Sequence, residues 1–568
     1  MVRLFNRSAK RKVSTLDGLW KFKIDPECKG VLEKWYENFP EDGMEAIVPS
    51  CWNNELGLYE YEGLAWYKTT FTTTKANVNL LFHAVTGQAE VYLDGKHLGG
   101  HYGGFTGFNF VVENLSAGEH TLVVAVDNTH DDLNTIPLAK VDWFHYGGIT
   151  RSVELMELDE VWICDCRIDY VLDRERKNAQ VQFAVELENL SGKKQERQLS
   201  IYAGEEKVYS ASVVVEGCIT VKTDPVEMKD IKLWDISQPN LYYFRFEIEE
   251  DDLIERTGFR TIKAENRKIL LNGREIYLQG VNRHEDHPDW GFAMPLKLMK
   301  KDMDIIKNLG CNAIRGSHYP NAKAFLDYCD QEGVLFFEEM PMWQYFEVHF
   351  KNPLIHERGL KMLEEMVKRD YHHPSIIIWS VHNEIATEHP LAFDLTKEFV
   401  DKVRSIDTTR LISYASSHTL EDICFSLVDV ICVNKYFGWY VGELEAWHAF
   451  LKDLKEKLER KGLGDKPIIM SEFGAAGIYG DSTFEAPKWT ENYQEKYLEY
   501  TLKLFKEDPD ISGAYIWQYC DIRSAKELAL GRARSFNNKG IVNEYRKPKM
   551  AYWMVQRIFK ASENKENQ

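Results

Sequence analysis

Two glutamates that each follow a run of apolar residues are the side chains of this 568-residue sequence best suited to chemistry. Ile376–Trp379 leads into Glu384, and Pro467–Met470 leads into Glu472. Apolar runs of this length, rich in isoleucine, are typical of strands buried on both faces. A (β/α)8 barrel keeps its catalytic groups where such strands end. Two glutamates in one barrel mouth could serve as the acid/base and the nucleophile of a retaining glycoside hydrolysis.

The elements that would position these glutamates follow Gly273, where strand-like runs begin to alternate with helical ones, as in βα units. Met299, Met303 and Ile306 share one helix face, and Gly310 follows where a left-handed cap belongs. We therefore predict a TIM barrel over residues 263–568, with a doubly wound sheet as the alternative. The eight candidate strands are Ile276–Val281, Ala313–Gly316, Val334–Glu338, Ile376–Val381, Leu411–Tyr414, Val430–Val433, Pro467–Met470 and Gly513–Trp517. Further candidate helices are Ile355–Arg369, Leu391–Val403, Leu444–Lys461 and Gln494–Lys506.

The residues before the barrel alternate apolar and polar positions in short runs and show no long helical period. Ala89–Leu93, followed by Asp94 and Gly95, predicts a strand that enters a tight hairpin. The pattern favours two β-sandwiches in a multidomain chain. We assign residues 1–160 to the first and residues 161–262, about 100 residues of short strands, to an immunoglobulin-like second.

Composition limits the partners that the chain could have. The formal net charge of −19 argues against nucleic acid, and an anionic substrate would have to be attracted by a few local cations. No apolar segment of a signal peptide follows the basic N-terminus, and no apolar run approaches the roughly 18 residues of a membrane span. We therefore expect a cytoplasmic protein without a membrane partner, whose ten scattered cysteines are reduced.

His284, Glu285, Asp286 and His287 are all possible metal ligands. Successive side chains alternate faces at a strand end, however, and no cysteine or third histidine lies at a supporting spacing. We expect a hydrogen-bonded network at the barrel mouth, with no metal and no cofactor.

Four segments near the predicted strand ends resemble glycoside hydrolase family 2, which includes β-galactosidases, β-mannosidases and β-glucuronidases. They are Gly280–Pro288, Arg315–Pro320, Trp379–Glu384 and Ser471–Gly474. The resemblance covers nearly the whole chain and implies a sugar-binding-like jelly-roll sandwich, an immunoglobulin-like sandwich and a catalytic barrel, in that order. It also implies that Glu384 is the acid/base and Glu472 the nucleophile, that Asn383 binds the sugar 2-hydroxyl, and that His318 binds substrate.

The nucleophile must stay ionised, so it needs hydrogen-bond donors. Tyr436, at the end of the sixth strand, is well placed to donate one to Glu472.

The loop after the eighth strand carries Asn537 and Lys539, an amide and an ammonium two positions apart. On an extended loop they point the same way and can bind a carboxylate, although a solvated basic loop is the alternative. The segment resembles the Asn-x-Lys motif of β-glucuronidases, which holds the C6 carboxylate of the sugar. This resemblance predicts a uronic acid substrate.

Further matches to β-glucuronidases imply additional substrate contacts. Tyr440 is expected to line the pocket, Trp517 to form the sugar floor, and Asp142 of the first sandwich to bind the 3- and 4-hydroxyls. The arginine four residues before the Asn-x-Lys motif has no counterpart, because that position is Ala533. Arg532 or Arg534 could substitute for it through a shifted loop, and Arg534 is included among the expected substrate contacts.

We thus expect a retaining β-glucuronidase that hydrolyses small or oligosaccharide β-D-glucuronides and assembles as a dimer or tetramer. The short loop Met340–Pro353 suggests an open cleft. A β-galacturonidase or another family-2 uronidase is the nearest alternative, followed by a β-galactosidase. A non-catalytic carbohydrate-binding protein is a further reading, which the intact pair of glutamates opposes.

Overall fold

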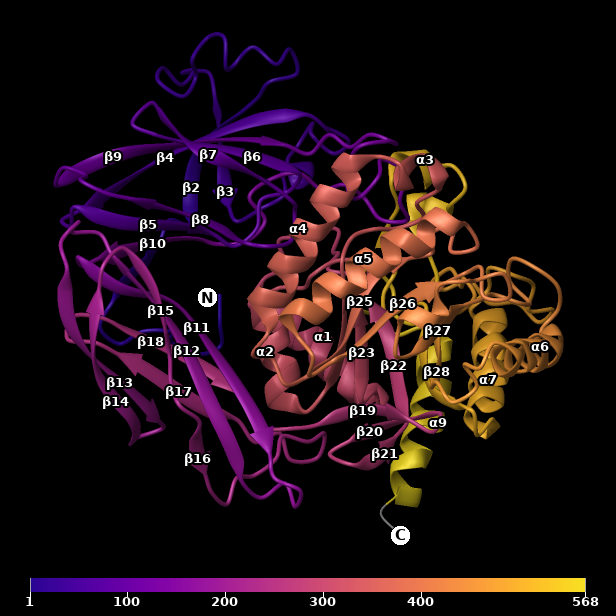
Figure 1. Cartoon of the computed structure of the whole chain (residues 1–568). Helices are drawn as coiled ribbons and strands as arrows, with labels where there is room; N and C mark the ends of the chain where they lie inside the picture. The colour runs from indigo at the N-terminus through magenta and orange to yellow at the C-terminus, as the bar shows by residue number, and fades with distance from the viewer. Residues whose placement is uncertain (1, 567–568) are drawn as a thin grey trace.

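The computed structural model describes the backbone of residues 2–566 and the side chains of residues 2–561. Two β-sandwiches lie on one side of a (β/α)8 barrel, as Figure 1 shows, so the predicted multidomain architecture is confirmed. In the described residues, no helix is both long and apolar enough to cross a membrane.

The first sandwich packs a six-stranded sheet on a four-stranded one. Alternating strands such as β4, with Ala65, Tyr67 and Phe71 buried, place one face of each sheet in a shared core. The six-stranded sheet has the order β3 (Met44–Val48), β2 (Gly18–Ile24), β4 (Leu64–Thr73), β9 (Gly118–Asp127), β6 (Gln88–Leu93) and β7 (Lys96–Tyr102). The four-stranded sheet has the order β1 (Lys12–Thr15), β10 (Val153–Leu158), β5 (Asn77–Phe82) and β8 (Phe108–Val112). The expected hairpin is present, because Asp94 and Gly95 join β6 to β7 with φ values of 49° and 78°.

The second sandwich consists of two four-stranded sheets, which enclose the core around Phe183, Phe244 and Phe246. In one sheet β12 (Ala179–Asn189) pairs with β11 (Val161–Leu172), β15 (Cys218–Lys222) and β16 (Val226–Met228). The other has the order β14 (Glu206–Val215), β13 (Gln195–Ala203), β17 (Tyr242–Glu247) and β18 (Asp252–Thr257).

Eight parallel strands form the closed barrel, in chain order. They are β22 (Leu278–Arg283), β23 (Ala313–Gly316), β24 (Leu335–Glu339), β25 (Ile376–Asn383), β26 (Leu411–Ser416), β27 (Ile431–Asn434), β28 (Ile468–Phe473) and β29 (Ile511–Ile516). Each predicted strand is found within a few residues of its expected bounds. One difference matters for the site: β28 continues past Met470, so Glu472 lies inside the strand rather than after it.

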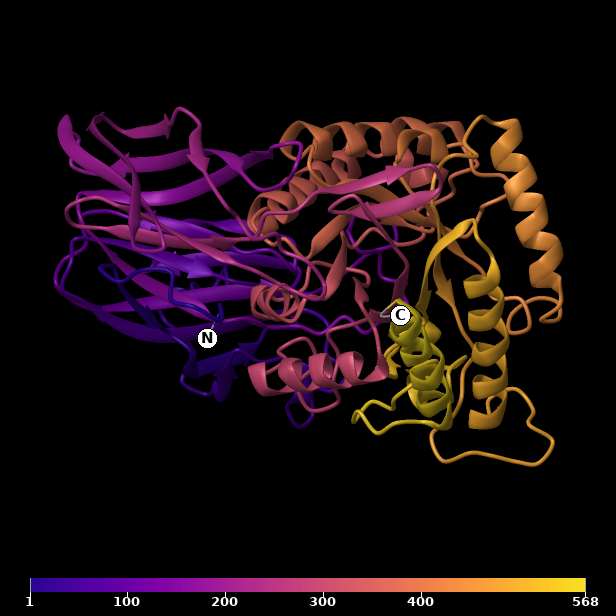
Figure 2. The same ribbon diagram turned by 90° about the horizontal axis from the view of Figure 1, so that it is seen from below.

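Helices surround the barrel, and their apolar faces complete its core. They are α1 (Leu296–Leu309), α2 (Lys323–Glu332), α3 (Glu347–Phe350), α4 (Pro353–Asp370), α5 (Pro390–Ile406), α6 (Ala446–Arg460), α7 (Glu491–Glu507), α8 (Lys526–Ala529) and α9 (Met550–Glu566). The predicted face of α1 is buried, and Gly310 caps the helix with a φ of 95°. The C-terminal helix α9, yellow in Figure 2, packs against α1 and α7.

A small antiparallel sheet covers the base of the barrel, away from the predicted catalytic end. It consists of β19 (Ile262–Glu265), β20 (Lys268–Leu271) and β21 (Arg274–Ile276). Ile269 and Leu271 pack there against Leu278, Ala313 and Leu335 at the starts of the barrel strands. The base is therefore filled with apolar side chains, which leaves the opposite end for polar ones.

Candidate active site

The two glutamates lie where the barrel ladder is irregular. Glu384 directly follows β25 and has a left-handed φ of 50°, which is uncommon for a residue with a side chain. The pairing register shifts near it, between Ser380 and Asn383, and again beside Glu472, where Asn434 is its partner. Such irregularities re-aim side chains and are common beside active sites.

Glu472 is buried between two strong hydrogen-bond donors. Arg315 Nη1 donates to its Oε1 at 2.6 Å, and the Tyr436 hydroxyl donates to its Oε2 at 2.8 Å, as the sequence predicted for Tyr436. Burial raises the pKa of Glu472; Arg315 opposes this shift, and the nearby charge of Glu384 adds to it. Both donors stabilise the ionised carboxylate, the form that a nucleophile requires.

Glu384 has neutral donors and a more open position. Gln344 Nε2 donates to its Oε2 at 2.9 Å and Asn434 Nδ2 to its Oε1 at 3.0 Å, while the residue itself is only half-buried. A carboxyl group at the barrel mouth that contacts amides can exchange a proton with substrate and water. The two surroundings therefore suit an acid/base at Glu384 and a nucleophile at Glu472.

Arg315 connects Glu472 to Glu339 and Asn383, and it had no assigned role in the sequence. It donates to Glu472, to Glu339 at 2.7 Å and to Asn383 Oδ1 at 2.7 Å, and it is fully buried. The only signal in the sequence was a basic residue at the end of the second barrel strand. Gln344 and Asn434 were also missed, because nothing in their spacing links them to Glu384.

Two of the expected substrate residues present buried polar atoms that lack a hydrogen-bond partner among the described residues, although one of them, on His318, lies 4.0 Å from Glu472 Oε1. These atoms are Asn383 Nδ2 and His318 Nε2. His318 Nδ1 pairs with Glu339 at 2.7 Å, which orients the ring, and the ring stacks on Trp517 with centroids 5.0 Å apart. The structure thus brings Asn383, His318 and Trp517 to the same end of the barrel as the two glutamates.

The first sandwich contributes Asp142 to a second cluster at the barrel mouth. Arg532 Nη2 donates to Asp142 Oδ1 at 2.7 Å, and Asn537 Nδ2 donates to its Oδ2 at 2.6 Å. Beside them Lys539 Nζ donates to the Tyr440 hydroxyl at 2.6 Å and lies 4.7 Å from that ring. Asn537 and Lys539 are 0% and 1% exposed, which excludes a solvated basic loop.

The structure distinguishes between the two candidate arginines. Arg534 pairs with Glu544 at 2.8 Å, donates to Asn538 Oδ1 at 3.2 Å and leaves about half of its side chain (48%) exposed. Arg532 is the arginine that joins the Asp142 cluster. The left-handed φ of 61° at Arg534 turns the chain between the two residues, and a substrate contact by Arg534 stays a prediction.

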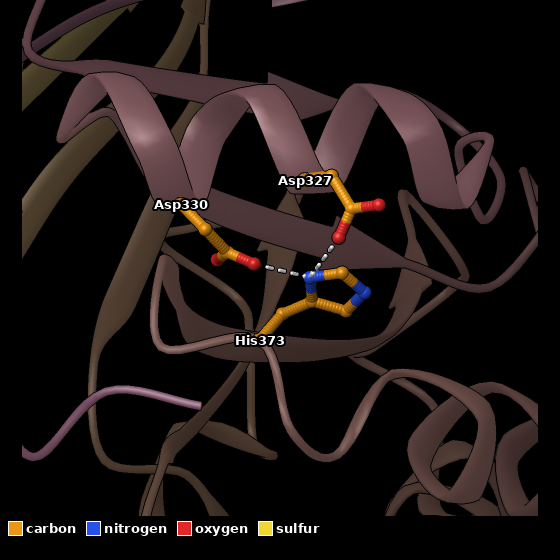
Figure 3. A group of neighbouring side chains, drawn as sticks. All are labelled: Asp327, Asp330 and His373. Atoms are coloured by element: carbon orange, nitrogen blue, oxygen red, sulfur yellow. Dashed lines mark hydrogen bonds and ion pairs between the residues drawn. The ribbon is translucent and has the colours of Figure 1, made fainter. Parts of the chain in front are cut away.

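One group of three potential metal ligands comes together within the described part of the chain, at Asp327, Asp330 and His373 (Figure 3). Its acceptors are already used: Arg3 and Arg256 donate to Asp327, and His373 lies 2.6 Å from Asp330. Two arginines make this cluster a poor fit for a metal ion, and we interpret it as an ion-pair network. His284–His287 do not form such a group.

Comparisons with known proteins agree with this geometry. Residues 13–159, 161–260 and 262–564 match the sugar-binding domain, the central domain and the TIM barrel domain of glycosyl hydrolases family 2. A β-glucuronidase of Streptococcus agalactiae is 28% identical and aligns over 95% of this chain and 94% of its own. Two solved structures each cover 99% of both chains: a β-galacturonidase of Eisenbergiella tayi bound to galacturonate (33% identity, TM-score 0.91) and a β-glucuronidase of an uncultured Clostridium species (28%, 0.88). The chain therefore belongs to glycoside hydrolase family 2 and is a retaining glycosidase.

Proposed function

We propose that this enzyme is a retaining β-uronidase whose preferred substrates are β-D-glucuronides. The observation that carries the proposal is the pair of buried residues Asn537 and Lys539, with the partly buried Arg532 beside them, at the mouth that holds Glu384 and Glu472. A chain of net charge −19 repels anions at long range, so binding of a sugar carboxylate must depend on such a local group. The solved relatives named as a β-galacturonidase and a β-glucuronidase support the same substrate class.

In the proposed reaction the Glu472 carboxylate attacks the anomeric carbon while Glu384 gives its proton to the leaving oxygen. The aglycone departs and a covalent glycosyl-enzyme forms. Glu384, now ionised, removes a proton from water, which displaces Glu472 and releases the uronic acid with its β configuration retained. The free Nδ2 of Asn383 is suited to the sugar 2-hydroxyl, and that contact strengthens as positive charge develops on the ring.

A β-galacturonide is the second candidate substrate. It is favoured by the 33% identity to the Eisenbergiella tayi β-galacturonidase, compared with 28% to the Clostridium β-glucuronidase. The two sugars differ only in the direction of the 4-hydroxyl. Asp142, held between Arg532 and Asn537, is the side chain that we propose to meet that hydroxyl.

The proposal is tested by the rates of hydrolysis of three aryl glycosides: β-D-glucuronide, β-D-galacturonide and β-D-galactoside. We expect kcat/KM to be highest for the glucuronide and lowest for the neutral galactoside. A galacturonide rate above the glucuronide rate would transfer the assignment to the second candidate. Fastest hydrolysis of the galactoside would contradict the uronidase proposal itself.

The role of the cationic loop is tested by Lys539→Met. A hydrogen bond to a charged group contributes roughly 1.5–3 kcal/mol, so kcat/KM on the glucuronide should fall on the order of 100-fold. Trace activity on the uncharged β-glucoside should be unchanged, because that sugar has no carboxylate. Lys526→Met is the matched control in the same segment after β29, since Lys526 pairs with Glu62 at 3.3 Å and contacts neither Asp142 nor the loop of Asn537 and Lys539 in the described interactions. An equal loss on both sugars would show that Lys539 supports the fold instead.

A further inference from the structure

Lys549 is a fully buried lysine beneath the loop that carries Asn537 and Lys539. Its side chain is 0% exposed, and it lies just before α9. Its ammonium donates to the Gly477 carbonyl at 2.6 Å, to Asp521 Oδ1 at 2.7 Å and to the Asn538 carbonyl at 3.0 Å. These three acceptors match the three N–H groups of an ammonium ion.

The acceptors belong to segments that follow two neighbouring barrel strands. Gly477 follows β28, the strand of Glu472, and Asp521 follows β29 and Trp517. Asn538 is the residue between Asn537 and Lys539, and its carbonyl also accepts from Gly477 N at 3.0 Å. Lys549 therefore ties the carboxylate-binding loop to the strand that bears the nucleophile.

The far side of the same loop is fixed by two more buried groups. Asp521 Oδ1 accepts from Gly540 N at 2.9 Å. Gln494 Nε2, on α7, donates to the carbonyls of Gly540 at 3.0 Å and Lys539 at 3.3 Å. The peptide groups on both sides of Lys539 are thus held by buried side chains, of which Gln494 also donates to the Ala475 carbonyl after β28 at 3.0 Å.

A buried ion pair is weak support for stability, because desolvation of two charges offsets much of their attraction. Burial lowers the pKa of Lys549 and raises that of Asp521 to about 7, which shows the cost of placing both groups here. Replacing both members of such a pair by apolar side chains is often neutral for stability, whereas replacing Lys549 alone leaves the buried Asp521 without its cation. The specific contribution of Lys549 is therefore the geometry of the loop that it holds.

We propose that Lys549 is a positioning residue for recognition of the sugar carboxylate, which rests on the proposed uronidase function. By fixing the Asn538 carbonyl, it aims the Asn537 amide and the Lys539 ammonium at one point. Lys549 acts through these two residues and does not itself touch the sugar. A group displaced by about 1 Å can cost on the order of 100-fold in rate, so a looser loop weakens uronate binding.

The experiment compares Lys549→Met with a matched control, Lys466→Met. Lys466 also uses its ammonium to bind backbone carbonyls, those of Phe425, Ser426 and Val428, but it precedes β28 at the opposite end of the barrel. For Lys549→Met we expect KM for the aryl glucuronide and the inhibition constant of free D-glucuronate to rise together, on the order of 10-fold. Activity on the uncharged β-glucoside should not change. Lys466→Met should alter neither constant.

A double variant shows whether Lys549 acts through Lys539. If it does, Lys549→Met should cost little more once Lys539→Met is present, because the group that it positions is already gone. The inference would be overturned if the free-energy losses of the two single variants added up in the double variant. An equal loss of activity on the uncharged glucoside would also overturn it. If Lys549→Met does not fold, Gln494→Met tests the same idea, with the same expected rise in KM. A wild type that hydrolyses no uronide overturns both proposals, whereas an active wild type with unchanged KM in the variants overturns only this one.

Discussion

Glu384 and Glu472 carry the same chemical group, but their surroundings predict different responses to substitution. Glu472→Gln should abolish turnover on every substrate, because Glu472 is the carboxylate that accepts hydrogen bonds from both Arg315 and Tyr436. Glu384→Ala should slow substrates with poor leaving groups far more than activated aryl substrates, since only the former need its proton. The measurement is kcat/KM over a series of aryl uronides of differing phenol pKa. A uniform loss across the series for Glu384→Ala would contradict the assignment of roles.

The raised pKa of Glu472 predicts the acid side of the pH profile. A nucleophile works only when ionised, so kcat/KM is lost as the pH falls through the pKa of Glu472, and burial places this loss above the ordinary carboxyl range. The Tyr436 hydroxyl donates to the ionised form. Tyr436→Phe should therefore raise the pKa further and move the acid limb to higher pH, with the basic limb unchanged. A shift to lower pH would mean that Tyr436 does not stabilise the carboxylate.

At the scale of residues, the sequence was informative where function depends on local pattern and uninformative where it depends on distant partners. The apolar runs before Glu384 and Glu472 and the tyrosine after β27 were sufficient to identify these residues. Arg315 contacts Glu472 across 157 positions of the chain, and Arg532 contacts Asp142 across 390. Spacing carries no signal over such separations, so Arg532 could not be distinguished from Arg534 before the loop conformation was known.

Among the elements, β28 and β29 remain close beyond their last paired residues, Phe473 and Ile516. A Cβ built on Gly474 would lie 2.1 Å from the Trp517 carbonyl oxygen. Gly474→Ala should therefore push apart the segments that carry Glu472 and Trp517 and lower kcat/KM on the order of 100-fold. Gly104→Ala is the control, because its Cβ would meet nothing closer than 3.4 Å. Full activity in Gly474→Ala would show that these segments can move freely.

The strands themselves were predictable because barrel strands are nearly continuous apolar runs. The ends of the strands were less predictable. The prediction ended the seventh strand at Met470, before the two polar residues Ser471 and Glu472. Phe473 is buried and pairs with Ile516, which carries the strand through these polar positions. A polar residue indicates the end of a strand only where no apolar residue that must be buried follows it in the sequence.

For the whole molecule, the N-terminal segment links the second sandwich to the barrel. Arg3 is 4% exposed and pairs with Glu255 of β18 and Asp327 of α2, at 3.1 and 2.9 Å. Removing one partner from a buried network typically costs about 3–5 kcal/mol, so Arg3→Met should lower the thermal midpoint clearly. Lys34→Met, which breaks the exposed pair with Glu37, should leave the thermal midpoint unchanged.

A chelator should also leave the thermal midpoint of the wild type unchanged, and a fall in that midpoint would indicate a metal at Asp327, Asp330 and His373.

Asp142 belongs to the first sandwich, yet its partners Arg532 and Asn537 come from the last part of the chain. During synthesis the aspartate leaves the ribosome long before the loop that it will meet. The sugar site therefore cannot form until Asn537 has left the ribosome, and a chain released between Glu472 and Arg532 would contain both glutamates and still be inactive. The onset of uronide hydrolysis in a translation reaction would thus report chains that extend beyond this loop.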